Sequence, residues 1–315
     1  MATSGSYNYS ATALSIVTEA LEFNGVSHSG QAITADDMTT CLRSLNIMSK
    51  QWSGNFDFAP GLKAFSRKTG YLFLQDGQGR YTLGPSGDNA SLSYKTTTMR
   101  IAGIATNTTL EVTSTTGMTA ADNIGIELNS GTIFWTTISS VTDSDTLVIP
   151  ATGLTSASAI GNRIFTYTTK LIRPLYMETV SVRDVDGNDS GLAEMTRNHY
   201  EAIYVKSTES SPSKYLYENT LTDGTFTLDT YPNNIRNVVR MVFMATAEDY
   251  DTQTDDISYP QEWFLPLAVG LAKITAPKFG QTWSVDKEDI YKNALMMART
   301  SYAETSEDYF QPGID

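Results

Sequence analysis

The sequence holds few of the residues from which catalytic and metal sites are usually built. Among its 315 residues are one cysteine, Cys41, and two histidines, His28 and His199, which lie in regions of different predicted structure. A single cysteine excludes an intrachain disulfide, and neither histidine shows metal-ligand spacing. The sequence also has no Gly-x-Ser-x-Gly elbow, phosphate-binding P-loop or complete dinucleotide fingerprint. We therefore expect no enzyme activity, no cofactor and no metal site.

Positive charge is scarce too, with 22 Lys and Arg against 35 Asp and Glu, a net charge of -13. Such a surface repels nucleic-acid phosphates and anionic lipid, although it could line a passage through which DNA slides. There is no run of about eighteen apolar residues and no charged-then-apolar leader. We expect a soluble protein of intracellular origin.

Carboxylates are the one abundant chemical group, and they occur in two notable clusters. Residues 184–189, DVDGND, begin like a calcium loop, but Asp189 stands where that loop needs glycine, so a hairpin turn explains them better. The loop 249–256 lacks glycine, and a solvated charge run is the simpler interpretation. Glycoside hydrolysis by a carboxylate pair stays open, because spacing in the fold cannot be read from the sequence.

The sequence is organised around residues 259–280, YPQEWFLPLAVGLAKITAPKFG. At about 3.6 residues per turn they predict a core helix with an apolar stripe. Pro260 suits the first position, Pro277 and Gly280 end the helix, and Pro266 predicts a bent or late-starting axis. The residues assigned to core or subunit packing are Trp263, Phe264, Leu267 and Leu271, with Gly270 and Ile274 on the same line.

Three further helices are predicted from caps and apolar spacing. Ser10 would cap a helix over 11–24 that Gly25 ends. Thr34 and Asp37 resemble a capping box before a second helix, which ends near residue 54 and forms a hairpin with the first. Ser284 would cap a last helix running to about residue 304. Its predicted buried face is Ile290, Tyr291, Ala294, Leu295, Met297, Ala298 and Tyr302.

The remaining pattern is that of strands. Residues 71–74 and 80–83 predict a hairpin around a glycine-rich turn. A Thr- and Ser-rich island at 98–169 contains a repeat, since 116–125 matches 152–161 at an offset of 36 residues. We interpret the island as an inserted β-sandwich or barrel, in which Trp135 belongs to the core rather than to a sugar-stacking platform. Further strands are expected at 179–184, 202–206, 215–218, 226–229 and 238–245.

The order of several short motifs resembles that of the head-to-tail adaptor proteins of short-tailed bacteriophages. These motifs are LRSLNIM at 42–48 followed by Gln51-Trp52, YTLGPSGD at 81–88, LDTYP at 228–232, and YPQEW at 259–263 opening a helix that closes at Phe279-Gly280. The resemblance covers roughly residues 11–97 and 170–304. The island at 98–169 departs from the smallest members of the family.

The resemblance implies a structural virion protein at the head–tail junction, assembled in the host cytoplasm. Family members form rings of about twelve copies below the portal protein, receive the tail tube or nozzle, and retain packaged DNA that passes without sequence-specific binding. In that interpretation the acidic end of the chain, 305–315, reaches the portal. The expected portal anchors are Tyr302, Tyr309 and Phe310, since aromatic anchors dominate interfaces.

These observations predict an α+β protein in which a helical hairpin and C-terminal helices accompany a β-rich core. The expected division is a main domain of 1–97 and 170–304, an inserted β domain of 98–169, and an extended tail of 305–315. Two other functions stay open. One is a tail-tube or baseplate subunit, and the other is a carbohydrate-binding or hydrolytic tail component acting through the inserted β domain.

Overall fold

A computed structural model describes residues 5–6, 8–28, 30–53 and 66–301. The chain divides into two compact units, residues 1–66 with 246–315 and residues 67–245. We call them the helical unit and the β unit. Both helices and strands are present in quantity, so the predicted α+β class is confirmed.

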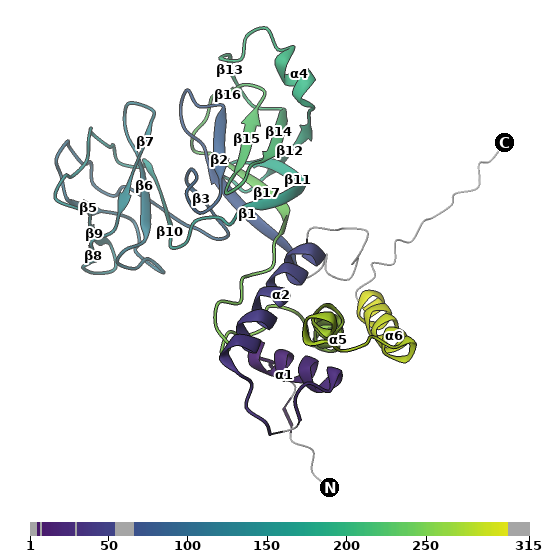
Figure 1. Ribbon diagram of the computed structural model, residues 1–315. Coiled ribbons are helices and arrows are strands. Elements are labelled where there is room, and N and C mark those ends of the chain that lie inside the picture. The colour runs from purple at the N-terminus through teal and green to yellow at the C-terminus, as the bar shows by residue number, and fades with distance from the viewer. Residues whose placement is uncertain (1–4, 7, 29, 54–65, 302–315) are drawn as a thin grey trace. The chain divides into compact units, whose positions relative to one another are not determined.

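Four α-helices form the described part of the helical unit. They are α1 (Ala13–Asn24), α2 (Ala35–Ser53), α5 (Phe264–Thr275) and α6 (Val285–Ser301). Helix α5 contacts each of the other three, and Figure 1 shows it beside α1 and α6. It is buried on nearly every side rather than along one stripe, because it has neighbours on several sides. Only Ile274 of the predicted line is substantially exposed.

Helix α5 starts late, as its proline predicts. A 3-10 turn, η2 (Gln261–Trp263), precedes it, and Pro260 lies before that turn rather than at the first α-helical position. Pro266 falls in the first turn of α5, where backbone N–H groups have no partner within the α-helix, so its missing N–H costs little. A second 3-10 turn, η3 (Ala276–Phe279), contains Pro277 and ends at Gly280, whose φ is +67°.

The other helix ends follow local chemistry, with one correction. Helix α1 is capped by Thr12, not by Ser10, because Thr12 and Ser15 form a reciprocal capping box. Gly25 ends the helix with φ +71°, as predicted. The Thr34 hydroxyl accepts from the Asp37 N–H at 3.2 Å, which confirms the second cap.

Helix α6 begins after Ser284, whose hydroxyl accepts from the backbone N–H of Lys287. Its predicted buried face is partly wrong. Ala294, Leu295 and Ala298 are buried, but Ile290 and Met297 face solvent. The helix rests on its neighbours along one narrow line, so the wide apolar face of the sequence is only half covered.

The larger sheet of the described chain has eight strands in the order β2-β15-β14-β12-β11-β17-β1-β3 and is nearly closed like a barrel. All its pairs are antiparallel except β12 with β14. The strands are β1 (Arg67–Phe73), β2 (Arg80–Leu83), β3 (Ala90–Ser91), β11 (Pro174–Arg183), β12 (Asp189–Glu194), β14 (Lys214–Asn219), β15 (Gly224–Leu228) and β17 (Val238–Ala245).

Two strand predictions fail in this sheet. Strands β1 and β2 form, but they do not pair as a hairpin: β1 pairs with β17 and β3, and β2 pairs with β15. Each strand pairs instead with a partner that is distant in the sequence, and these pairings replace the hairpin that the local turn predicts. The predicted strand at 202–206 is instead the turn after the short helix α4 (Arg197–Glu201), and Tyr204 there is 99% exposed. A two-stranded pair, β13 (Glu209–Ser210) with β16 (Tyr231–Pro232), follows.

The threonine-rich island has its own sheets and its own core. Its core holds Met99, Val112, Ile124, Ile126 and Ile164 among others. One sheet has the order β4-β10-β6-β7 and the other the order β5-β9-β8, which fits the expected small β-sandwich or barrel. The strands are β4 (Lys95–Thr98), β5 (Thr109–Glu111), β6 (Asn123–Glu127), β7 (Ile133–Thr137), β8 (Ser140–Val141), β9 (Thr146–Val148) and β10 (Arg163–Tyr167).

The units do not follow the predicted domain division. The sequence predicts one main domain for the helices and the flanking strands. In the structure the helices and the strands belong to different compact units, and the chain passes from one unit to the other after residues 66 and 245. Helices and strands have separate apolar cores. The island lies within the β unit, where Phe165 and Tyr167 of its sheet pack against Phe73 of β1.

The internal repeat has a structural counterpart, but with a changed register. Gly117 and Gly153 both have positive φ, at the predicted offset of 36 residues. Beyond them the equivalence shifts to 40 residues, because strand β6 begins at Asn123 and β10 at Arg163. The second copy therefore carries four extra residues between its glycine turn and its strand.

Candidate functional site

The predicted portal anchors, Tyr302, Tyr309 and Phe310, lie outside the described residues. Their role therefore stays a prediction. The four residues assigned to core or subunit packing have different positions. Trp263, Leu267 and Leu271 are fully buried in the core of the helical unit itself, while Phe264 is only partly buried. Of this set, Phe264 alone has a side chain with surface to offer a neighbouring molecule.

Phe264 lies in a groove between α1 and α5. The groove has a volume of about 580 Å3, and its apolar lining includes Tyr9, Leu14, Phe264 and Leu265. The Tyr9 and Phe264 rings meet edge to face, with centroids 5.9 Å apart. Leu265 is 53% exposed although it belongs to the otherwise buried helix α5.

Apolar side chains also point outward from the other helices. Contiguous exposed apolar surface, such as the groove between α1 and α5, marks protein interfaces more often than scattered single side chains do. On the helical unit the exposed large apolar residues are Tyr9, Leu14, Ile47, Leu265, Ile274, Val285, Ile290, Met296 and Met297. All four helices therefore present apolar surface that the unit's own core does not use.

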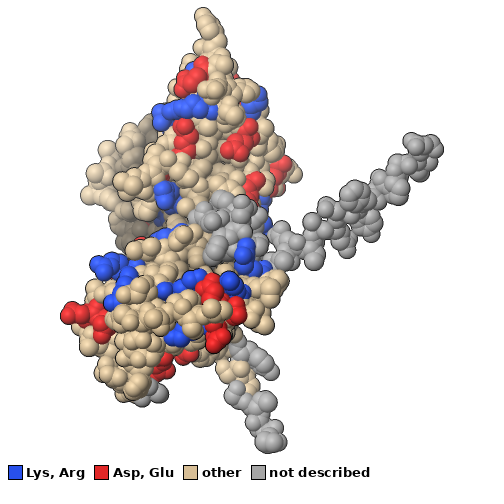
Figure 2. All heavy atoms as spheres, turned by 45° about the vertical axis from the view of Figure 1, so that its right-hand side comes forward, with Lys and Arg blue, Asp and Glu red and all other residues tan. Residues whose placement is uncertain are grey.

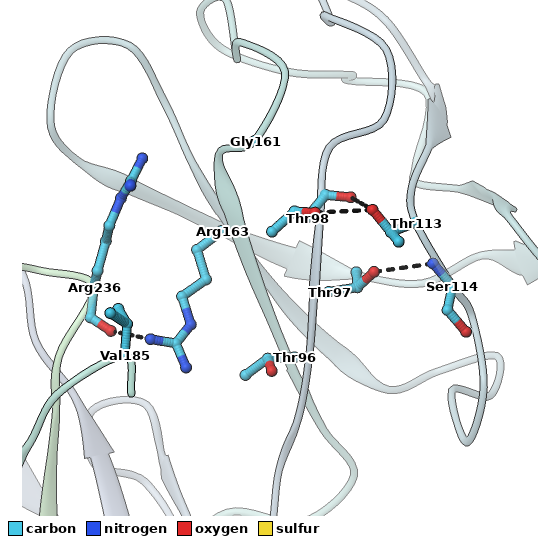
Figure 3. A pocket seen from close by; sticks show the side chains of 9 residues that line it. All are labelled: Thr96, Thr97, Thr98, Thr113, Ser114, Gly161, Arg163, Val185 and Arg236. Atoms are coloured by element: carbon cyan, nitrogen blue, oxygen red, sulfur yellow. Dashed lines mark hydrogen bonds between the residues drawn. The ribbon is translucent and has the colours of Figure 1, made fainter. Parts of the chain in front are cut away.

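A second candidate site, in the β unit, combines hydroxyl groups with arginines. Its volume is about 460 Å3, and it is lined by the edge strand β4 and by four other segments of the β unit. Figure 3 shows how its lining residues lie. They are Thr96, Thr97, Thr98, Thr113, Ser114, Gly161, Arg163, Val185 and Arg236. We call it the hydroxyl–arginine pocket.

The two arginines of this pocket have different partners. Arg163 donates from Nη1 to the backbone carbonyl of Arg236 at 2.6 Å, as Figure 3 shows, and its guanidinium lies 4.9 Å from the centroid of the Phe165 ring. Arg236 instead donates from Nε to Glu127 at 2.8 Å. Partial burial, opposed in part by Tyr94, lowers the pKa of Arg163, and the neighbouring charge of Arg236 adds to the lowering.

Several hydroxyl groups on the threonine side of the pocket form hydrogen bonds within the protein. The Thr97 hydroxyl accepts from the backbone N–H of Ser114 at 3.1 Å, and the hydroxyls of Thr98 and Thr113 lie 2.8 Å apart. Each hydroxyl can both donate and accept, so these contacts leave capacity for a ligand. None of the nine described residues that line the pocket is acidic. The pocket therefore offers a cationic group beside several neutral donors and acceptors.

Sequence reasoning missed this pocket. Its residues come from five separate stretches of the chain, and only the run of three threonines at 96–98 forms a local signal in the sequence. Trp135, by contrast, is placed as expected: it is partly buried and its ring packs against Phe73 and Tyr167 of the β unit.

The carboxylate clusters fold as turns. Asp184 accepts from the Asn188 side chain and from the backbone N–H groups of Asn188 and Asp186, and these bonds hold its pKa below the usual range. The Asp255 carboxylate accepts from the hydroxyl and the backbone N–H of Thr252, and these bonds lower the pKa of Asp255. Within the described ranges, no three or more His, Cys, Asp or Glu side chains come together as a metal site.

Charges of both signs lie close to one another on the surface. Figure 2 shows one face, on which blue Lys and Arg side chains lie among red Asp and Glu side chains, with no broad field of either sign. Among the helices that the structure describes, none combines the length and the apolarity needed to span a bilayer.

Comparison with known proteins adds no identification. No protein-family model matches this sequence, and no curated protein matches it significantly.

Proposed function

We propose that this protein is a structural subunit of a bacteriophage virion, which forms an oligomeric ring between the portal and the tail. The observation that carries the proposal is the outward apolar surface of the helical unit. The described helices of this unit already share an apolar core, and Leu265, Ile290 and Met296 lie outside it at the surface. The motif order described above supports the same interpretation.

Ring formation gives that surface a physical role. When one face of a subunit binds a different face of the next, the contact repeats and closes into a ring if the rotation permits. The groove between α1 and α5 supplies one apolar face, and the outward residues of α6 supply another. In this proposal both faces are covered by second copies of the chain.

The proposed partners are the portal on one side and the tail tube or nozzle on the other, with DNA passing through the lumen. A net charge of -13 supports a passage that does not retain DNA by attraction.

The C-terminal residues Tyr309 and Phe310 are the proposed portal anchors. Deletion of residues 305–315 should leave a folded protein that no longer joins portal rings, whereas unchanged joining would remove the tail from the account.

A substitution at the groove tests the ring interface. Leu265→Glu places a charge in the exposed groove at the second position of α5, where an acidic side chain favours the helix dipole and so spares the fold. We expect the variant to remain folded by circular dichroism but to lose higher oligomers in light scattering. Leu221→Glu is the matched control, because Leu221 is 93% exposed in the β unit. Equal assembly of both variants would contradict the proposed interface.

A carbohydrate-binding tail component is the second candidate function. The observation that favours it is the hydroxyl–arginine pocket in the β unit. A tail-tube or baseplate subunit would use the same apolar surface with a different neighbour, and mixing with purified portal protein separates it from the ring proposal.

A further inference from the structure

We infer that the hydroxyl–arginine pocket is a binding site for an acidic sugar, in which Arg163 holds the carboxylate and the threonine hydroxyls bind the ring hydroxyls. The inference concerns the β unit alone. It does not depend on whether the helical unit forms a ring, and it names acidic sugars as the class of ligand that the pocket binds.

The guanidinium of Arg163 provides the charge for an anion. It is only part-exposed and one of its five N–H groups bonds the Arg236 carbonyl, while no acidic residue lines the pocket. Glu127, the nearby carboxylate, accepts from the backbone N–H of Arg163 and from the Arg236 side chain. Among the residues that the structure describes, no carboxylate bonds the Arg163 side chain, and a ligand carboxylate would supply one in the fork geometry that guanidinium favours.

The threonine side of the pocket provides groups for a polyhydroxylated ligand. Thr96 lies exposed on the edge strand β4, and its hydroxyl has no hydrogen-bond partner among the described residues. Thr113 and Ser114 extend the row of hydroxyls. Hydroxyl side chains both donate and accept, and so do sugar hydroxyls, so each can satisfy the other. A simple anion would use the arginine and leave these groups to water.

Two other ligand classes fit the pocket less well. A nucleic acid would bring many phosphates to a protein whose net charge is -13, and repulsion opposes that approach. A peptide would be expected to extend the sheet at the free edge of β4. That edge is already occupied at its end, because the Thr98 carbonyl accepts from the Thr113 N–H at 2.9 Å and Met99 bridges to Val112.

Calorimetry on the full-length protein tests the inference, with glucuronate, glucose, acetate and inorganic phosphate as probes. We expect glucuronate to bind, and glucose and acetate each to bind at least about tenfold more weakly. Glucose lacks the carboxylate that Arg163 would hold, and acetate lacks the ring hydroxyls that the threonines would bind. Absence of glucuronate binding at millimolar concentration would overturn the inference. Phosphate or acetate binding as tight as that of glucuronate would also overturn it, because the site would then recognise charge alone.

Substitutions connect the binding to the pocket. Arg163→Gln should weaken glucuronate binding by at least about tenfold through loss of the charged hydrogen bonds. Thr96→Val preserves shape at an exposed position, and should weaken glucuronate binding about threefold or more without changing acetate binding. Arg197→Gln on α4 removes the same charge outside the pocket lining and should bind as the wild type does. Unchanged glucuronate binding by Thr96→Val would contradict the hydroxyl contacts even if Arg163→Gln failed to fold.

Discussion

At the scale of single residues, the β unit contains a close contact between a glycine and a tryptophan that could not be predicted from the sequence. Gly125 of β6 pairs with Trp135 of β7, and a Cβ at position 125 would lie 2.7 Å from ring atoms of that tryptophan. The glycine thus makes room for an indole that packs on Phe73 and Tyr167. Sequence reasoning placed Trp135 in the core but had no reason to connect it with this glycine.

Gly125→Ala should therefore destabilise the β unit. The added methyl group must displace the tryptophan or the backbone, and overpacking of this kind costs about 1–3 kcal/mol of unfolding free energy. Denaturant unfolding followed by tryptophan fluorescence measures the loss. The control is Gly191→Ala on β12, where a Cβ would meet nothing within 4 Å. Equal stability of the two variants would mean that Trp135 does not occupy this position.

Glu288 is the carboxylate that connects two helices of the helical unit. Its side chain accepts from Lys273 of α5 at 2.7 Å and from the Trp283 indole N–H at 2.9 Å. The bond from Lys273, followed by that from Trp283, holds the pKa of Glu288 below its ordinary value of 4.5. A lowered folded-state pKa stabilises the fold above the unfolded-state pKa, and that contribution disappears as the pH falls through the folded-state value.

Glu288→Gln should accordingly lower stability at pH 7 and have little effect in acid. We expect the difference in unfolding free energy between wild type and variant to shrink as the pH falls below about 4.5. Denaturant titrations at pH 7 and at several values below that point measure it. A difference that stayed constant down to acid pH would show that the contacts, rather than the charge, matter.

At the scale of secondary-structure elements, helix boundaries were more predictable than helix surroundings. Gly25, Gly280 and the caps at Thr34 and Ser284 could be predicted because caps depend on a few neighbouring residues. The buried face of α6 could not, because the sequence has more apolar residues there than the neighbouring helices cover. Strands β1 and β2 were found but mispaired, since pairing depends on partners far along the chain.

The corrected cap of α1 gives a direct test. Thr12→Ala removes the hydroxyl that accepts from the Ser15 N–H, and loss of such a cap costs about 1 kcal/mol. Ser10→Ala changes the residue that the sequence favoured, and it should leave stability unchanged. Thermal unfolding followed by far-ultraviolet circular dichroism compares the two. A larger loss for Ser10→Ala would reverse the assignment.

At the scale of the whole molecule, the fold class followed from composition and periodicity, but the division of the chain did not. Periodicity separates helices from strands, so α+β was predictable. It does not tell which elements share a core, and the helices of residues 1–66 and 246–315 form a unit of their own. The hydroxyl–arginine pocket was hidden for the same reason, because it joins Thr96, Arg163 and Arg236 across long stretches of chain.

The central claim is that the helical unit is built to bind further copies of itself at the portal. Electron microscopy of the purified wild-type protein mixed with purified portal rings tests it most directly. The account predicts a closed ring of this protein stacked on the portal, with the β units repeated around it. Particles that remain single 34.5 kDa chains beside unchanged portal rings would contradict it.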